Sequence, residues 1–140
     1  MAIIGGEGSA GFTAHPKFDA VTTGAYITVT SAAAAWAAPD TGFGAWIEAI
    51  ANIGTSKRLV GYVVASKHAN TVGFEIEIGE GAAASEAAIL RDVFINPNFQ
   101  YGWKVYTWKN LTNSARLAAR VRDSHTSALT YDLIPILDSV

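Results

Sequence analysis

The sequence of 140 residues contains no cysteine, few charged residues and no long apolar run. Without cysteine, the chain forms neither a disulfide framework nor a metal site with thiolate ligands. Charged residues make up 16% of the chain and the formal net charge is −2. This balance gives no general electrostatic reason to expect nucleic acid as a partner. No stretch approaches the ~20 apolar residues of a membrane-spanning helix, so we expect no membrane partner.

The first residues show no sign of export. The segment MAIIGGEGSAGF lacks the basic start of a signal peptide, and its apolar run is too short for one. Half of the residues are apolar, which at this length is enough for one domain with a core. We therefore expect a soluble, single-domain protein made without a signal peptide.

What the sequence does contain is a series of short strand-like segments. In FEIEIG, the apolar residues Phe74, Ile76 and Ile78 alternate with Glu75 and Glu77, as in a strand with one apolar face. Similar segments, bounded by Gly, Asn, Ser or Asp turn signals, are AYITVTS, AWIEAIA, RLVGYVVAS, residues 89–95, WKVYTW, ARLAARVR and TYDLIPIL. The spacing predicts an all-β fold, an antiparallel β-sandwich of about eight strands, and we expect a jelly roll.

Two regions depart from this pattern. Residues 1–23 are rich in glycine before Phe12 and show no sustained periodicity, so we expect an extended N-terminal arm, followed by the β-sandwich domain at 24–140. The segment SAAAAWAAPDTG is rich in alanine, which favours helix, but Pro39 would soon end a helix. We predict a loop there.

The stretch FEIEIGEGAAASEAAIL, residues 74–90, superficially resembles a dinucleotide-binding turn, in which a strand, a glycine-rich loop and a helix follow one another. However, the chain has no second strand–helix repeat, and Glu80 and Glu86 would place negative charge where a pyrophosphate binds. No lysine follows the loop, as a P-loop requires. We interpret the stretch as a tight turn in which small residues allow close backbone packing, and we expect no cofactor.

The same stretch carries a family resemblance. The segment IEIGEGAAASE, followed by ARLAARVRD and a final apolar strand, is similar to bacteriophage virion β-sandwich proteins, in which a GxGAAGSE-like corner precedes a GTRIAARV-like strand. The similarity covers about residues 45–137. The sequence departs from the pattern at Ala84, where the pattern has Gly, and at Ser114-Ala115, where it has Gly-Thr. The resemblance implies a structural virion component, either a capsid decoration (cement) protein or a tail-associated protein.

No pattern of catalytic or metal-binding residues stands out. The three histidines are scattered along the chain, at His15, His68 and His125. A zinc site needs at least three ligands with ordered spacing, and we interpret the pair Asp123 and His125 as part of a solvated turn. There is no G-x-S-x-G motif, and Glu75 and Glu77 are neighbours on one strand, which indicates a solubilising outer face. We expect no enzyme activity, no catalytic residue and no metal.

The segment YGWKVYTWKN is rich in aromatic residues. Alternation places one set of side chains on one strand face (Tyr101, Trp103, Val105, Thr107) and a second set on the other (Lys104, Tyr106, Trp108). Since only one set can face the core, the other would expose large rings, which indicates a binding surface. Protein interfaces are enriched in Trp and Tyr, so we favour a protein interface through Trp103, Tyr106 and Trp108 over a sugar-stacking platform.

The segment ARLAARVRD also has two faces. Leu117, Ala119 and Val121 form an apolar row, and Arg116, Arg120 and Arg122 form a basic row. Guanidinium groups suit carboxylates, which could belong to another subunit or could be Glu75 and Glu77 in the same sheet. The sequence leaves both alternatives open, and we include the three arginines among the expected interface residues.

The N-terminal arm has apolar residues separated by glycines and small residues, namely Ile3, Ile4, Phe12 and Phe18. Nothing in the neighbouring sequence would bury these side chains, so the arm would fray in an isolated subunit. We expect these four residues to become ordered against a neighbouring subunit or the capsid.

Together with the resemblance, these features predict a non-enzymatic structural protein of a phage particle, located in the virion after assembly in the host cytoplasm. The first expectation is a capsid decoration protein that stabilises the shell by binding the major capsid protein or another virion protein. The alternative is a tail or fibre module that binds host-surface glycans through the aromatic strand. We expect a homo-oligomer, first of all a trimer, because the resemblance implies that such proteins gather around threefold positions.

Overall fold

The computed structural model describes residues 27–36, 41–69, 73–95 and 103–140, except for the side chains of residues 103–106. These residues contain no helix. Their strands are β1 (Ile27–Thr30), β2 (Ile47–Ile50), β3 (Lys57–Lys67), β4 (Gly73–Glu80), β5 (Ala87–Ile95), β6 (Trp103–Asn110), β7 (Leu117–Asp123) and β8 (Thr130–Ser139). The predicted N-terminal arm, with Ile3, Ile4, Phe12 and Phe18, lies outside the described residues.

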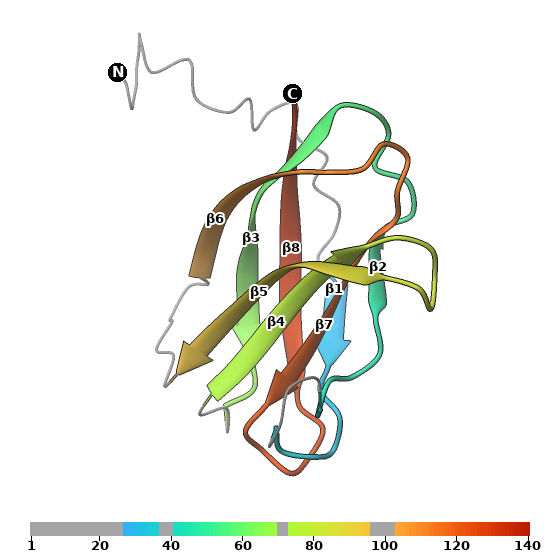
Figure 1. Cartoon of the computed structure of the whole chain (residues 1–140). Coiled ribbons are helices and arrows are strands. Elements are labelled where there is room, and N and C mark those ends of the chain that lie inside the picture. The colour runs from blue at the N-terminus through green and yellow to red at the C-terminus, as the bar shows by residue number, and fades with distance from the viewer. Residues whose placement is uncertain (1–26, 37–40, 70–72, 96–102) are drawn as a thin grey trace, which may run out of the picture.

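The strands form two antiparallel sheets that pack face to face (Figure 1). The first sheet has the order β1-β8-β3-β6, and the second sheet has the order β2-β7-β4-β5. The predicted antiparallel β-sandwich of eight strands is therefore confirmed. Each strand of the first half of the chain pairs with one of the second half, in the combinations β1–β8, β2–β7, β3–β6 and β4–β5. The pairs β3–β8 and β4–β7 complete the two sheets.

The two lateral sides of the sandwich differ in the length of their edge strands. On one side lie β1 and β2, with 4 residues each. On the other side lie β5, with 9 residues, and β6, with 8 residues (Figure 1). Short edge strands limit pairing with other chains, whereas long ones offer more backbone to a partner.

The core lies between the sheets, because alternate residues of each strand point inward. The alternation predicted for β4 is confirmed, since Phe74, Ile76 and Ile78 are buried. The ring of Phe74 stacks on Phe94 and on Tyr131, with centroid distances of 4.7 and 4.8 Å. Stacked rings of this kind add to the free energy gained from apolar burial.

Polar side chains also connect the elements inside the sandwich. The Tyr62 hydroxyl on β3 donates a hydrogen bond of 2.8 Å to Asp92 on β5, and so joins the two sheets. Burial, together with this hydrogen bond and the charge of Asp92, raises the pKa of Tyr62 well above its ordinary value. The hydroxyl therefore stays protonated and remains a donor.

A second buried polar group is the carboxylate of Asp123 at the end of β7. This side chain is 0% exposed, and it accepts hydrogen bonds from Ser31 Oγ at 2.8 Å, the Tyr131 hydroxyl at 2.9 Å and the His125 backbone N–H at 2.9 Å. The interpretation of this segment as a solvated turn is wrong for Asp123. The carboxylate instead connects β7 with β8 and with the segment after β1.

The stretch at residues 74–90 is a hairpin between β4 and β5. Strand β5 lies where a dinucleotide-binding turn would have a helix, so the interpretation as a tight turn is confirmed. A Cβ atom at Gly79 would lie 2.7 Å from the Trp46 ring and 2.9 Å from the Ala87 carbonyl oxygen. Glycine is therefore needed at this position for Trp46 to pack on the strand. The described part of SAAAAWAAPDTG, residues 31–36 and 41–42, is a loop, as predicted.

Two departures from the family pattern coincide with unusual backbone conformations. Ala84 has a φ of 65° and Ser114 has a φ of 61°. Both lie in the left-handed region, which glycine enters without steric cost and other residues do not. At these two positions the chain keeps a conformation that suits the glycine of the pattern.

Candidate functional site

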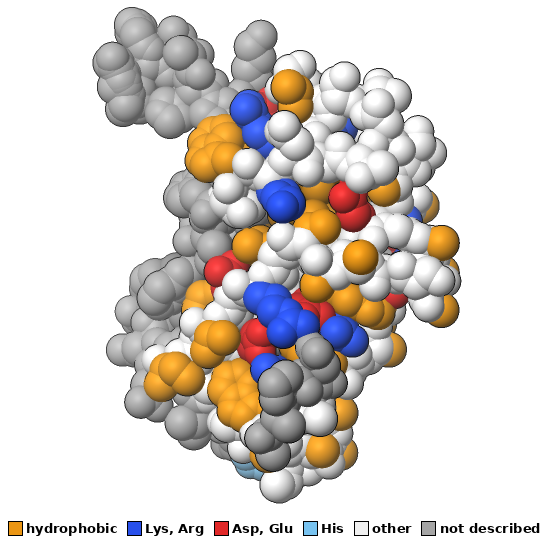
Figure 2. Space-filling model, viewed as in Figure 1, with side chains coloured by type: hydrophobic (Ala, Val, Ile, Leu, Met, Phe, Trp, Pro, Cys, Tyr) orange, Lys and Arg blue, Asp and Glu red, His pale blue; other side chains and the backbone are white. Residues whose placement is uncertain are grey.

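The outer face of the second sheet carries charged side chains that are buried rather than solvated. Glu75 is 4% exposed and Glu77 is 0% exposed. The prediction of a solubilising outer face is therefore wrong. The connection from β1 to β2 runs over this face and covers it with the rings of Trp36, Phe43 and Trp46, which contact the arginines of the sheet. Figure 2 shows basic and acidic side chains interleaved in the middle of this face.

The strand register explains how the charges meet. Glu75 pairs with Arg122 and Glu77 with Arg120 on the neighbouring strands β4 and β7. The carboxylate oxygens lie 2.5 Å from Arg122 Nη2 and 2.6 Å from Arg120 Nε, respectively. Arg91 on β5 pairs with Glu77 as well. The alternative in which Glu75 and Glu77 are partners within the same sheet is therefore confirmed.

Aromatic rings cover these ion pairs from above. The guanidinium carbon of Arg120 lies 4.2 Å from the centroid of Phe43 and 4.5 Å from that of Trp46. That of Arg122 lies 4.7 Å from Phe43 and 5.3 Å from Trp36. Each arginine thus lies between a carboxylate and aromatic rings, an arrangement in which cation–π attraction strengthens as water is excluded. We call Glu75, Glu77, Arg91, Arg120 and Arg122 the charged layer.

The third predicted arginine forms a separate cluster. Arg116 contacts Glu48 Oε2 through Nε at 3.0 Å and Glu86 Oε2 through Nη1 at 2.5 Å. The side chains of Arg116, Arg120 and Arg122 are 16%, 23% and 12% exposed. Each of the three arginines pairs with at least one glutamate of the same chain, and their role in an interface stays a prediction.

The side of the sandwich formed by β5 and β6 presents large apolar side chains to solvent. Val93 and Ile95 on β5 are 57% and 64% exposed, and Trp108 on β6 is 47% exposed. Within the part of the chain that the structure describes, β5 pairs only with β4, and β6 only with β3. We call these three exposed residues, Val93, Ile95 and Trp108, the edge residues. Val93 and Ile95 lie on one long edge strand, and Trp108 lies on the other.

Trp108 lies at an irregularity in β6. Leu59 pairs with Lys109 and Gly61 with Tyr106, so that Thr107 and Trp108 both lie opposite Val60. Trp108 has a φ of 61°, an outlier for a bulky residue. The bulge interrupts the period of two at the end of the segment 101–108, and Trp108 is exposed, as one of the two predicted sets of side chains would be.

The ring of Trp108 is supported from one side. The guanidinium carbon of Arg58 lies 4.9 Å from the ring centroid, and Arg58 Nη2 contacts Asp138 Oδ2 at 2.9 Å. Trp103 and Tyr106 belong to β6 by their backbone, while their side chains lie outside the described part of the structure.

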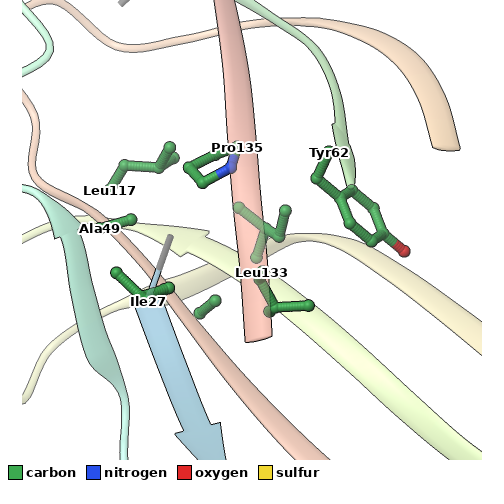
Figure 3. Close-up of a pocket in the computed structure, with 8 residues that line it drawn as sticks. Ile27, Ala49, Tyr62, Leu117, Leu133 and Pro135 are labelled. Atoms are coloured by element: carbon green, nitrogen blue, oxygen red, sulfur yellow. The ribbon is translucent and has the colours of Figure 1, made fainter. Parts of the chain in front are cut away.

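A small cavity lies between the sheets, with a volume of about 10 Å³, near the room that one water molecule needs. Its lining is apolar and includes Ile27, Ala49, Leu117, Leu133 and Pro135, and the Tyr62 hydroxyl points away from it (Figure 3). The cavity is too small for an organic ligand.

Sequence reasoning missed two sets of residues at these surfaces. Val93 and Ile95 share a strand face with Arg91, and the alternation in β5 contained enough information to find them. Trp36, Phe43 and Trp46 gave no local signal, because their role as a cover depends on the tertiary path of the connection.

Comparison with known proteins gives no relative for this chain, because no family model, no curated protein and no solved structure matches it. Among residues 27–36, 41–69, 73–95 and 103–140, no group of three or more His, Asp or Glu side chains could hold a metal ion. The same residues contain no helix that is long and apolar enough to cross a membrane.

Proposed function

We propose that this chain is a structural protein of a phage particle, namely a capsid decoration protein that stabilises the shell by binding other virion proteins. The observation that carries the proposal is the exposure of the edge residues, Val93 and Ile95 on β5 and Trp108 on β6, on the two long edge strands. Large exposed apolar groups, and edge strands that pair on one side only among the described residues, favour contact with another protein chain. A protein that assembles on a shell needs exposed groups of this kind.

The strand order supports the jelly-roll part of the prediction. Pairing of the first strand with the last, and so on inward to β4 and β5, is the arrangement of a long hairpin folded into two sheets. Jelly rolls of eight strands occur in viral capsid domains. This likeness is one of architecture, and it supports the virion proposal together with the sequence resemblance.

The experiment that tests the proposal is mass spectrometry of purified, tail-free phage heads, followed by binding of the recombinant chain to heads that lack it. We expect the chain in the heads, and we expect a Val93→Asp, Ile95→Asp double variant to bind at least about tenfold more weakly, because two charges would be desolvated at the contact. A Thr126→Asp, Ser127→Asp variant adds the same charge on an exposed loop and should bind normally. Absence of the chain from heads would refute the proposal.

A second candidate function is favoured by Trp108 alone. Its ring is 47% exposed and lies against Arg58, and an exposed indole ring of this kind can stack on a sugar. In that case the chain would be a tail or fibre module, and Trp108→Ala would abolish binding on a glycan array.

The expected homo-oligomer, first of all a trimer, is tested by light scattering of the recombinant chain.

A further inference from the structure

The outer face of the first sheet carries an apolar row that does not belong to the core between the sheets. The row consists of Val60 and Val63 on β3 and Ile134 and Ile136 on β8. Val63 pairs with Ile134 in the strand register, and Val60 lies at a bulge next to Gly61, which pairs with Ile136. The neighbouring residues Tyr62, Leu133 and Leu137 point to the core instead. We call these four residues the outer row.

Polar pairs bound the outer row at both ends. At one end, the Asp132 carboxylate accepts hydrogen bonds from Thr28 Oγ1 and Ser66 Oγ, both at 2.6 Å. At the other end, Arg58 contacts Asp138 at 2.9 Å. These polar side chains pair with each other at the two ends, and the four apolar residues of the outer row lie between them on the two central strands.

The exposure of the outer row is uneven. Val60 is 0% exposed, whereas Val63, Ile134 and Ile136 are partly exposed. Half-covered apolar side chains on central strands indicate a surface that another segment can complete.

The position of Ile27, the first described residue, indicates which segment of the chain could cover the outer row. Ile27 is the first residue of β1, the edge strand of the first sheet, and it pairs with Leu133 next to Ile134. The twenty-six residues before it therefore join the domain at the border of the outer row. Strand β8 spans roughly 33 Å, and residues 12–26 alone could span roughly 50 Å when extended. The N-terminal residues are thus long enough to cross the whole face.

We propose that residues 1–26 of the same chain dock on the outer row, with Phe12 and Phe18 packed against Val63, Ile134 and Ile136. The sequence alone indicated a neighbouring subunit as the partner of these apolar residues, because no local surface for them was evident. The structure supplies one on the same chain. Covalent attachment next to the surface gives the segment a high effective concentration there, which a second copy lacks. The proposal does not depend on the virion function.

The test uses the full chain and exploits its lack of cysteine. Val63→Cys and Ile136→Cys, prepared separately, report access to the outer row through their rate of maleimide labelling. Val93→Cys on the second sheet is the control site. Each is combined with Phe12→Ser and Phe18→Ser, or with the matched polar pair Lys17→Ser and Asp19→Ser.

We expect the phenylalanine substitutions to increase the labelling rate at positions 63 and 136 by about tenfold. The reason is that the docked segment would no longer protect the two cysteines from the maleimide. The polar pair should leave these rates unchanged, and labelling at position 93 should not respond to either pair. The protection should be the same at low and high protein concentration. An unchanged rate with Phe12→Ser and Phe18→Ser would overturn the proposal. Protection that disappears on dilution would also overturn it, by assigning the cover to a second copy.

A second readout needs no cysteine. The chain with Phe12→Ser and Phe18→Ser should bind more of a dye that reports exposed apolar surface than the unsubstituted chain, at equal β content in circular dichroism. If the cysteine variants do not fold, this comparison decides the question. Equal dye binding by the two chains would refute docking.

Discussion

Ala84 and Ser114 are single residues whose backbone conformations lower the stability of the fold. Both adopt a left-handed backbone, with φ values of 65° and 61°, in the β4–β5 and β6–β7 connections. A residue with a Cβ atom pays about 1–2 kcal/mol for this conformation, because the Cβ approaches a carbonyl oxygen. Glycine avoids this cost but loses more backbone entropy on folding.

We predict that Ala84→Gly and Ser114→Gly each raise the free energy of unfolding by about 0.5–1 kcal/mol, the difference between these two effects. Urea denaturation measures the change. Ala83→Gly is the control, because Ala83 is exposed and does not have a positive φ. It should lower stability by up to about 1 kcal/mol through backbone entropy alone. A loss of stability in Ala84→Gly would show that relief of strain does not dominate.

The connection from β1 to β2 shows the effect of a whole element on the sheet beneath it. Its rings cover the charged layer, and Arg122 Nη1 also donates to the Thr41 carbonyl oxygen at 3.1 Å. Buried charges cost solvation free energy, and here each is offset by partners of opposite charge and by hydrogen bonds. Removal of Glu77 would leave the part-buried Arg120 without its carboxylate partner.

We therefore predict that Glu77→Ala lowers the free energy of unfolding by about 3 kcal/mol, because Arg120 loses its carboxylate and Arg91 loses the nearer of its two carboxylates and keeps only Glu75 at 4.0 Å. Glu48→Ala is the matched control. Glu48 also contacts an arginine but is 49% exposed, so its removal should change stability by less than about 1 kcal/mol. Thermal or urea unfolding distinguishes the two. Equal effects of the two substitutions would mean that the charged layer contributes no more than a surface ion pair.

The link between β3 and β5 predicts a pH dependence. The pKa of Tyr62 is raised in the folded chain, mainly by burial, whereas in the unfolded chain it is about 10. Below pH ~10 both states hold the proton, so the contribution of Tyr62 to stability is complete. Above this pH the unfolded chain releases the proton and the folded chain retains it, so stability falls as the pH rises.

The prediction is that the urea midpoint of the native chain falls above pH ~10 more steeply than that of Tyr62→Phe. At neutral pH, Tyr62→Phe should cost about 1–2 kcal/mol, because Asp92 loses a hydrogen-bond donor. The difference between the two proteins isolates Tyr62 from other groups that titrate at alkaline pH. Parallel pH profiles would show that the hydroxyl is not protected in the native state.

At the scale of the whole molecule, the fold depends on contacts between distant parts of the chain. Strand β8 lies between β1 and β3 and completes the centre of the first sheet. Strand β1, the first described strand, can therefore pair only when β8, the last strand of the chain, is in place. Folds with such long-range pairing form slowly and cooperatively.

We predict that a chain ending at Leu129 does not fold, because the first sheet would lose one of its two central strands and β1 would lose its pairing partner. A chain ending at Asp138 is the control. It lacks Ser139 and Val140, which contribute only a few polar contacts at the end of the strand, and it should retain cooperative unfolding. Far-UV circular dichroism and thermal unfolding measure both. Cooperative unfolding of the shorter chain would contradict the assignment of β8 as an indispensable strand.

The amino-acid sequence by itself determined the positions of the strands and turns. Alternation of apolar and polar residues in segments such as 74–78 and 117–121 is a local property, and it reports which residues face the core. The glycine at position 81 is an equally local signal, because its φ of 133° is a backbone conformation that glycine adopts and other residues rarely do. The same alternation separated the arginines of β7 from its apolar row.

Only the tertiary structure decided which outer sheet faces are exposed to solvent. Glu75 and Glu77 have the sequence pattern of solvated residues, but a connection more than twenty residues away in the chain covers them with aromatic rings. Likewise, the position of Trp108 follows from a bulge that is set by pairing with β3, which alternation within β6 cannot reveal. Periodicity describes the two faces of a strand, whereas burial of the outer face depends on which distant segment packs on it.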